Sequence, residues 1–92
     1  MDFEWNESKR LQTIDKHNID FVEAVTIFLG RYLILDARSE VEKRLIAVGE
    51  LDGSVIAVIH TLRGDTCRII TARKARRDER ERYQALLDGG DP

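Results

Sequence analysis

An Asp-Gly pair at residues 52 and 53 lies between two apolar runs, "KRLIAVGEL" and "SVIAVIHTL". Asp-Gly favours the two-residue turn that joins antiparallel strands, so this pattern is the strongest local constraint on the fold. A second turn at Gly64-Asp65 precedes "TCRIITARK", and the run "RYLILDA" precedes the first hairpin. These segments predict an antiparallel β-meander.

The N-terminal half of the chain carries the signals of helices. Asn6 is a helix-capping residue, and Leu11 and Ile14 belong to the apolar side of the helix that follows it. The segment ends with "KHN", where cations suit the end of a helix and Asn18 tolerates a left-handed backbone. A first helix is therefore predicted between these two asparagines.

A capping box predicts a second helix, because Asp20 is followed three residues later by Glu23. Apolar residues then recur at the 3.6-residue spacing of an amphipathic helix: Phe21, Ala24, Val25, Phe28 and Leu29. Gly30 ends this pattern. A last helix is expected from about Arg76 to Leu87.

Ninety-two residues suffice for one small domain with a thin core. We therefore expect a single domain over residues 1–92, with 88–92 as a frayed tail. The predicted fold class is α+β: an antiparallel meander with the two N-terminal helices on one sheet face and a C-terminal helix. Three helices cover two apolar sheet faces incompletely, which favours a partner protein.

Composition limits the class of protein. The single cysteine, Cys67, cannot form an internal disulfide, and the acidic N-terminal residues do not resemble a signal peptide. No apolar run reaches membrane-spanning length. We therefore expect a soluble, cytoplasmic protein without a membrane partner, and the net charge of −2 argues against a uniformly basic nucleic-acid binder.

Charge is nevertheless uneven, since residues 63–82 hold eight basic and four acidic side chains. If both turns have two residues, Thr61 faces both Arg44 and Arg68, and these three side chains gather with Arg63 at one end of one sheet face. The same register places three apolar residues beneath them: Ile46, Ile59 and Ile70. It places another set on the opposite face: Val58, His60, Leu62, Ile69 and Thr71.

The arginine cluster has two interpretations. Arginine forks fit phosphate oxygens, so the cluster is typical of a phosphate clamp. It is also typical of a charged sheet edge that resists aggregation. No His, Cys or Asp cluster has metal-ligand spacing, so any phosphodiester chemistry is expected to need no metal.

Other candidate residues also have two interpretations. His60 in the run "VIHT" is either a packed core histidine or a proton carrier at a cleft. Glu79 and Tyr83 share one helix face and can serve as an acid–base pair. Alternatively, Glu79 is a carboxylate at the helix start and Tyr83 is an apolar anchor.

Several segments together resemble the BrnT family of type II toxins: "FEWNESKR", "KHNIDFVEAVTIF", "RLIAVGELDG", "VIHTLRG" and "RIITARKARRDERERY". The resemblance extends from about Phe3 to Tyr83. This chain departs from the family pattern by Asn18 in place of glycine, Thr71 in place of serine, and Arg76 in place of a capping threonine. The last change is expected to weaken the start of the final helix.

The resemblance implies a RelE-like ribonuclease that inhibits translation and growth. It also implies neutralisation by a cognate, BrnA-like antitoxin with a ribbon-helix-helix part, so that operator DNA is bound only through the complex. On this basis we expect Arg63, Arg68 and Arg73 to stabilise the transition state, with Glu79 and either Tyr83 or His60 as acid and base. Three further cations are expected to hold the RNA: Lys9, Arg44 and Lys74.

Two alternatives remain open from the sequence. Related folds inhibit DNA gyrase by binding, and a basic sheet face suits that activity as well. The second alternative is an inactive toxin that survives as the partner in an autorepressor complex. No cofactor is expected in any of these cases.

Overall fold

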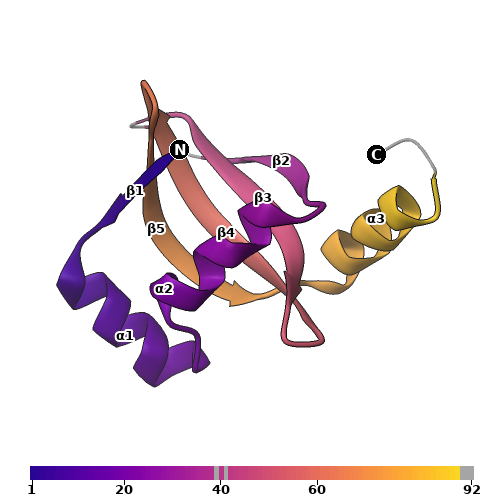
Figure 1. Ribbon diagram of the computed structural model, residues 1–92, viewed down its shortest axis with the longest axis horizontal. Coiled ribbons are helices and arrows are strands. Elements are labelled where there is room, and N and C mark those ends of the chain that lie inside the picture. The colour runs from indigo at the N-terminus through magenta and orange to yellow at the C-terminus, as the bar shows by residue number, and fades with distance from the viewer. Residues whose placement is uncertain (39, 41, 90–92) are drawn as a thin grey trace.

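The computed structural model describes residues 1–38, 40 and 42–89, and these form an α+β protein with one five-stranded mixed sheet (Figure 1). Its elements are β1 (Asp2–Trp5), α1 (Glu7–His17), α2 (Phe21–Ala24), the 3₁₀ helix η1 (Val25–Leu29), β2 (Leu33–Ala37), β3 (Arg44–Leu51), β4 (Ser54–Arg63), β5 (Thr66–Lys74) and α3 (Arg77–Leu87). The predicted frayed tail includes residues 90–92, which lie outside the described residues.

The strand order is β1-β5-β4-β3-β2, and β2 to β5 pair with their sequence neighbours in antiparallel fashion. The sheet is not purely antiparallel, however, because β1 adds a parallel edge strand along β5. The sequence did not predict β1. A four-residue segment that pairs with a strand some sixty residues away carries no local turn signal.

Both predicted two-residue turns are confirmed, with Leu51 opposite Ser54 and Arg63 opposite Thr66. In the first turn Asp52 and Gly53 both have positive φ, at 49° and 81°. Asp-Gly favours this conformation, because glycine bears no Cβ and aspartate tolerates the left-handed region.

A bulge in β5 changes the predicted faces. His60 pairs with Ile69 as predicted, but Ile59 pairs with Thr71, so Ile70 is the extra residue. The prediction for Thr71 was therefore wrong, since it shares a face with Ile59 and not with His60. An inserted residue reverses the side-chain alternation beyond it, which also places Arg73 on the Arg68 face.

Asn6 and Asp20 cap the first two helices as predicted, but the reciprocal Asp20–Glu23 capping box is not among the hydrogen bonds of the described residues. The Asn6 side chain accepts a hydrogen bond from the Lys9 amide at 3.1 Å, and Asn18 ends α1 with φ 56°. Asp20 accepts from the Val22 amide at 3.0 Å at the start of α2. Leu11 is a correction, because it is 54% exposed while Thr13 is the buried residue of α1.

The predicted second helix is α-helical only as far as Ala24 and continues as η1. A 3₁₀ helix has three residues per turn, so its buried position after Ala24 is Ile27, at 3% exposure. Leu29 was predicted on the apolar side but is 88% exposed. Gly30 follows the last residue of η1, as predicted.

Two apolar clusters form the core, one on each sheet face. The larger lies beneath α2 and η1 and includes Phe21, Ile27 and Val58, together with the fully buried Cys67. The smaller joins α3 to β2 and β3 and includes Leu33, Val48, Ala75 and Tyr83. On this face α3 packs over β3 and β2, whereas α1, from the N-terminal end of the described chain, contacts β5.

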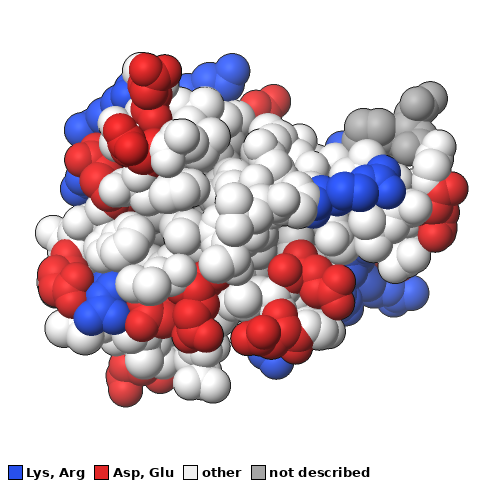
Figure 2. All heavy atoms as spheres, in the orientation of Figure 1, with Lys and Arg blue, Asp and Glu red and all other residues white. Residues whose placement is uncertain are grey.

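Figure 2 looks onto the face covered by α2 and η1 and shows an uncharged area surrounded by side chains of both signs. The opposite face carries Arg68 and Arg73, because they pair with Thr61 and Ala57 on that side of β4. Arg68 and Arg73 of β5 therefore lie on the face turned away from α2.

Candidate nucleic-acid interface

Three cations from three elements line one cavity of about 490 Å³, which we call the arginine cavity. Arg44 begins β3, Arg68 lies in β5, and Lys9 lies in the first turns of α1. The remaining lining residues are Asn6, Ser8, Gln12, Glu42, Ile69 and Ile70. The structure thus brings together Arg44, Arg68 and Lys9, which were all candidates from the sequence.

The guanidinium groups at this end of the sheet lie near described carboxylates. Arg44 Nε lies 3.9 Å from Glu42 Oε1, and Arg63 Nη2 lies 3.7 Å from Glu42 Oε2. Arg68 Nη1 lies 3.7 Å from Glu4 Oε1. Each distance exceeds that of a normal hydrogen bond, so the charges attract without a fixed fork-to-carboxylate geometry. Among the described side chains, the Nε of Arg44 is buried without a hydrogen-bond partner.

Arg63 belongs to the neighbouring cavity, which it shares with Thr61 and Glu42. Thr61 is buried, and its hydroxyl donates to the Lys43 carbonyl at 2.9 Å, which ties the start of β3 to the end of β4. Glu42 lines both cavities. The predicted gathering of Arg44, Thr61, Arg63 and Arg68 at one end of the sheet is therefore what the structure shows.

Arg73 is held by a carboxylate. Its Nη1 and Nη2 donate to the two oxygens of Glu79 at 2.7 and 3.0 Å, and the Arg76 amide donates to the same carboxylate at 2.7 Å. Glu79 is 4% exposed, and its hydrogen bonds with Arg73 lower its pKa. Glu79 thus links β5 to α3. Its carboxylate also accepts from the backbone at the start of α3, where the Arg76 side chain makes no capping hydrogen bond, and α3 begins at Arg77.

Tyr83 lies on the same buried side of α3, at 5% exposure, within the smaller core cluster. Its hydroxyl donates to the Arg31 carbonyl at 3.4 Å. The environment is that of an anchor between α3 and the chain before β2.

His60 lies on the opposite face from the arginine cavity, at 2% exposure. Its ring packs edge-on against Phe28, with centroids 5.3 Å apart, and its Nδ1 lies 3.1 Å from the Val58 carbonyl. A carbonyl can only accept, so this nitrogen carries the proton. Burial lowers the pKa of the ring, which favours the neutral form.

Lys74 ends β5 and lines a different cavity of about 330 Å³, which also holds the carboxylates of Asp20, Glu23 and Asp52. Arg73 and Lys74 therefore point to opposite faces of the strand. The structure does not bring Lys74 together with the arginine cavity.

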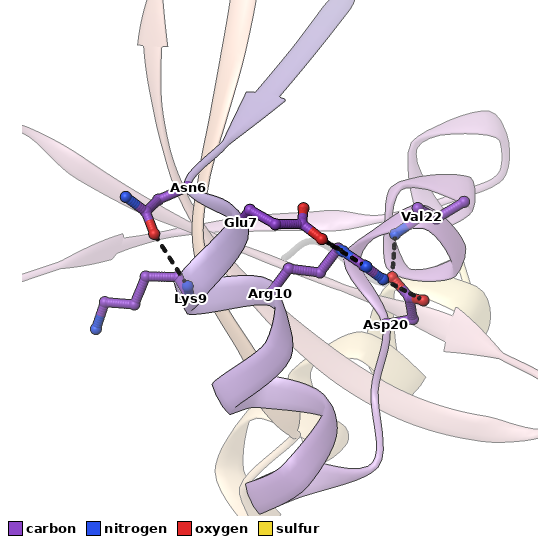
Figure 3. A network of polar contacts seen from close by, with 6 residues as sticks. All are labelled: Asn6, Glu7, Lys9, Arg10, Asp20 and Val22. Carbon is purple, nitrogen blue, oxygen red and sulfur yellow. Dashed lines mark hydrogen bonds and ion pairs between the residues drawn. The ribbon is translucent and has the colours of Figure 1, made fainter.

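Sequence reasoning missed Arg10, which fixes the helix that carries Lys9. Its guanidinium donates to Glu7 at 2.6 and 2.9 Å and to Asp20 at 2.9 Å, so it links α1 to the first turn of α2 (Figure 3). The Glu7–Arg10 spacing of three residues is a helical pair that the sequence contains, whereas the contact with Asp20 depends on the path between the helices. Glu4 and Glu42 were also missed, because neither lies in a pattern typical of an acid–base residue.

Among the described residues, no group of His, Cys, Asp and Glu side chains is arranged to hold a metal ion. Across the same residues, every helix is too short or too polar to cross a membrane.

A family model described as "Ribonuclease toxin, BrnT, of type II toxin-antitoxin system" matches residues 5–79. The chain belongs to this family of ribonuclease toxins. The matched region includes α1, which carries Lys9, and it extends to Glu79 in α3. No curated protein sequence matches the chain. Membership of a type II toxin–antitoxin family implies an antitoxin protein as partner.

Proposed function

We propose that this BrnT-family toxin is a metal-independent endoribonuclease that binds its scissile phosphate in the arginine cavity. The observation that carries the proposal is the convergence of Arg44, Arg68 and Lys9 on one cavity in a chain of net charge −2. An open hollow lined by cations attracts a polyanion even when the whole protein is acidic. The family description, a ribonuclease toxin, supports RNA as that polyanion.

In the proposed reaction the ribose 2′-oxygen forms a bond to phosphorus while the bond to the 5′-oxygen breaks, leaving a 2′,3′-cyclic phosphate. Arg44 and Arg68 donate hydrogen bonds to the oxygens whose negative charge grows in the transition state. Glu42, the carboxylate that lines the arginine cavity, accepts the 2′-hydroxyl proton. Water at the open cavity supplies a proton to the leaving 5′-oxygen.

The roles predicted for Arg73, Glu79, Tyr83, His60 and Lys74 stay predictions. We leave them out of the proposed mechanism because of their surroundings. Glu79, Tyr83 and His60 are each at most 5% exposed, and Arg73 is bonded to Glu79. Lys74 shares its cavity with three carboxylates.

We extend the proposal to the biology that the resemblance implies. The toxin has a RelE-like fold, acts in the cytoplasm as a single domain, and inhibits translation by cutting RNA. A BrnA-like antitoxin with a ribbon-helix-helix part neutralises it and brings the complex to operator DNA. Membership of a type II toxin–antitoxin family supports such a partner.

The test is cleavage of RNA in the presence of a chelator, comparing the wild-type chain with Arg68→Gln. We expect the wild type to cut, and we expect the variant to lose about 10²-fold in rate, the typical cost of one charge-stabilising donor. The matched control is Arg77→Gln, whose side chain is 86% exposed on α3 and pairs with Glu81. Both variants remove one positive charge, so only a local role separates them.

Other results would count against the proposal. RNA left intact together with blocked DNA supercoiling would support a gyrase inhibitor. Normal growth after induction of the toxin without its antitoxin would support an inactive repressor partner. Equal cleavage by Arg68→Gln and Arg77→Gln would remove the arginine cavity from the mechanism.

A further inference from the structure

A second, smaller cavity of about 130 Å³ adjoins the arginine cavity between α1 and β5. Its lining residues are Lys9, Gln12, Thr13, Lys16, His17 and Thr71. Lys9 and Gln12 line both cavities, so the two are neighbours. We call this smaller cavity the α1 groove. One wall is α1, which follows β1 along the same edge of β5, and Thr71 comes from the strand.

Two lysines line the α1 groove, and no Asp or Glu is among the described residues of its lining. Lys9 and Lys16 are both exposed, and neither forms an ion pair with a described residue. They are seven residues apart, which places them about 10.5 Å apart along the helix axis and on similar sides of it. This separation allows the two lysines to bind different phosphates of one strand.

Neutral polar groups complete the α1 groove. Gln12 offers an amide, and Thr71 offers a hydroxyl that is only partly exposed. Thr71 lines the groove because the bulge at Ile70 shifts the pairing of β5 beyond it. Groups that both donate and accept suit a ribose 2′-hydroxyl, which distinguishes RNA from DNA.

We propose that the α1 groove holds the stretch of a single RNA strand next to the scissile phosphate, with Lys16 binding a second phosphate. The inference rests on the proposed function, which places the scissile phosphate in the arginine cavity. Its substrate is a single-stranded RNA longer than a dinucleotide, because only such a strand can occupy both cavities. An acidic peptide of the antitoxin is the competing occupant, and the experiment separates the two.

The experiment measures binding and cleavage by the full-length chain and by Lys16→Gln, with Arg77→Gln as the control for loss of one charge. Binding is measured with a 2′-O-methyl oligonucleotide, which cannot undergo 2′-hydroxyl attack, over a range of salt concentrations. We expect Lys16→Gln to weaken binding about threefold and to reduce the salt slope by about 0.7, the value for one phosphate of a single strand. Cleavage of a long RNA should show a raised KM with kcat unchanged, and cleavage of a dinucleotide should be unaffected.

The inference is overturned if Lys16→Gln and Arg77→Gln bind the oligonucleotide equally. It is also overturned if Lys16→Gln slows dinucleotide cleavage as much as long-RNA cleavage, or if it weakens only the binding of a poly-glutamate peptide. If the wild-type chain binds RNA through Lys16 but never cuts it, the proposed nuclease function fails while the α1 groove stands. If the chain binds no RNA, both fail.

Discussion

Replacing Glu79 with glutamine should destabilise the fold by about 3 kcal/mol. The carboxylate is buried and accepts from Arg73 twice and from the Arg76 amide once. Removing one member of a buried ion pair typically costs about 3–5 kcal/mol, because the remaining charge lacks compensation. The lower end applies here, since the Arg73 side chain is 19% exposed and can reach water, and glutamine retains one acceptor oxygen.

Urea unfolding followed by circular dichroism measures this loss. About 3 kcal/mol corresponds to a fall of about 15 °C in Tm for a domain of this size. The matched control is Glu81→Gln, which breaks the exposed pair with Arg77 and should change stability by less than about 0.5 kcal/mol. If Glu79→Gln unfolds at the same urea concentration as Glu81→Gln, the reasoning about a buried, coupled carboxylate is wrong.

The same pair predicts how stability varies with pH. The pKa of Glu79 is lower in the folded chain than its ordinary value of 4.5, chiefly because of its hydrogen bonds with Arg73. The stabilisation is therefore fully present above the unfolded pKa and is lost as the pH falls through the folded pKa. Wild type and Glu79→Gln should converge in stability in this acidic range, whereas a difference that persists unchanged at low pH would contradict the linkage.

Two further substitutions test the packing of the N-terminal half. Gly49→Ala should lower the free energy of unfolding by about 2 kcal/mol, because the new Cβ would lie 2.9 Å from the Ile27 Cβ and push η1 off the sheet. The control is Gly30→Ala, whose new Cβ meets nothing within 4 Å. It should leave the unfolding midpoint unchanged in the same urea titration. Asp20→Ala should cost about 1.5 kcal/mol through the lost Val22 cap and the lost ion pair to α1, while Asp20→Asn should keep most of the cap. Equal losses for the alanine and asparagine variants would show that the cap contributes little.

The sequence predicted well the features that depend on neighbouring residues. The Asp52-Gly53 turn needs two positive φ angles, and that local requirement also fixes the register of the hairpin it closes. Counting from the turns placed Arg44, Thr61, Arg63 and Arg68 correctly at one end of the sheet. The sequence therefore predicted that Arg44 and Arg68 lie close together, as they do in the arginine cavity.

Features that depend on distant contacts were not predicted. The bulge at Ile70 leaves no mark in "RIITARK", because both registers place apolar or small residues at mid-strand. Likewise, whether Glu79 faces an RNA or Arg73 depends on where α3 docks, and the helical period alone fits both. The place of Glu42 beside the cavity depends on the path from β2 to β3, for which the sequence offers no periodic signal.

The solitary thiol of Cys67 has a practical consequence. It is fully enclosed beside β4, and burial raises its pKa to about 11, so at neutral pH it is protonated as well as inaccessible. A thiol-specific dye can then react only when the β5 region opens, and the chain contains no other cysteine to compete. The rate at which Cys67 is labelled therefore measures how often the β5 region opens. An antitoxin that binds β5 should lower this rate.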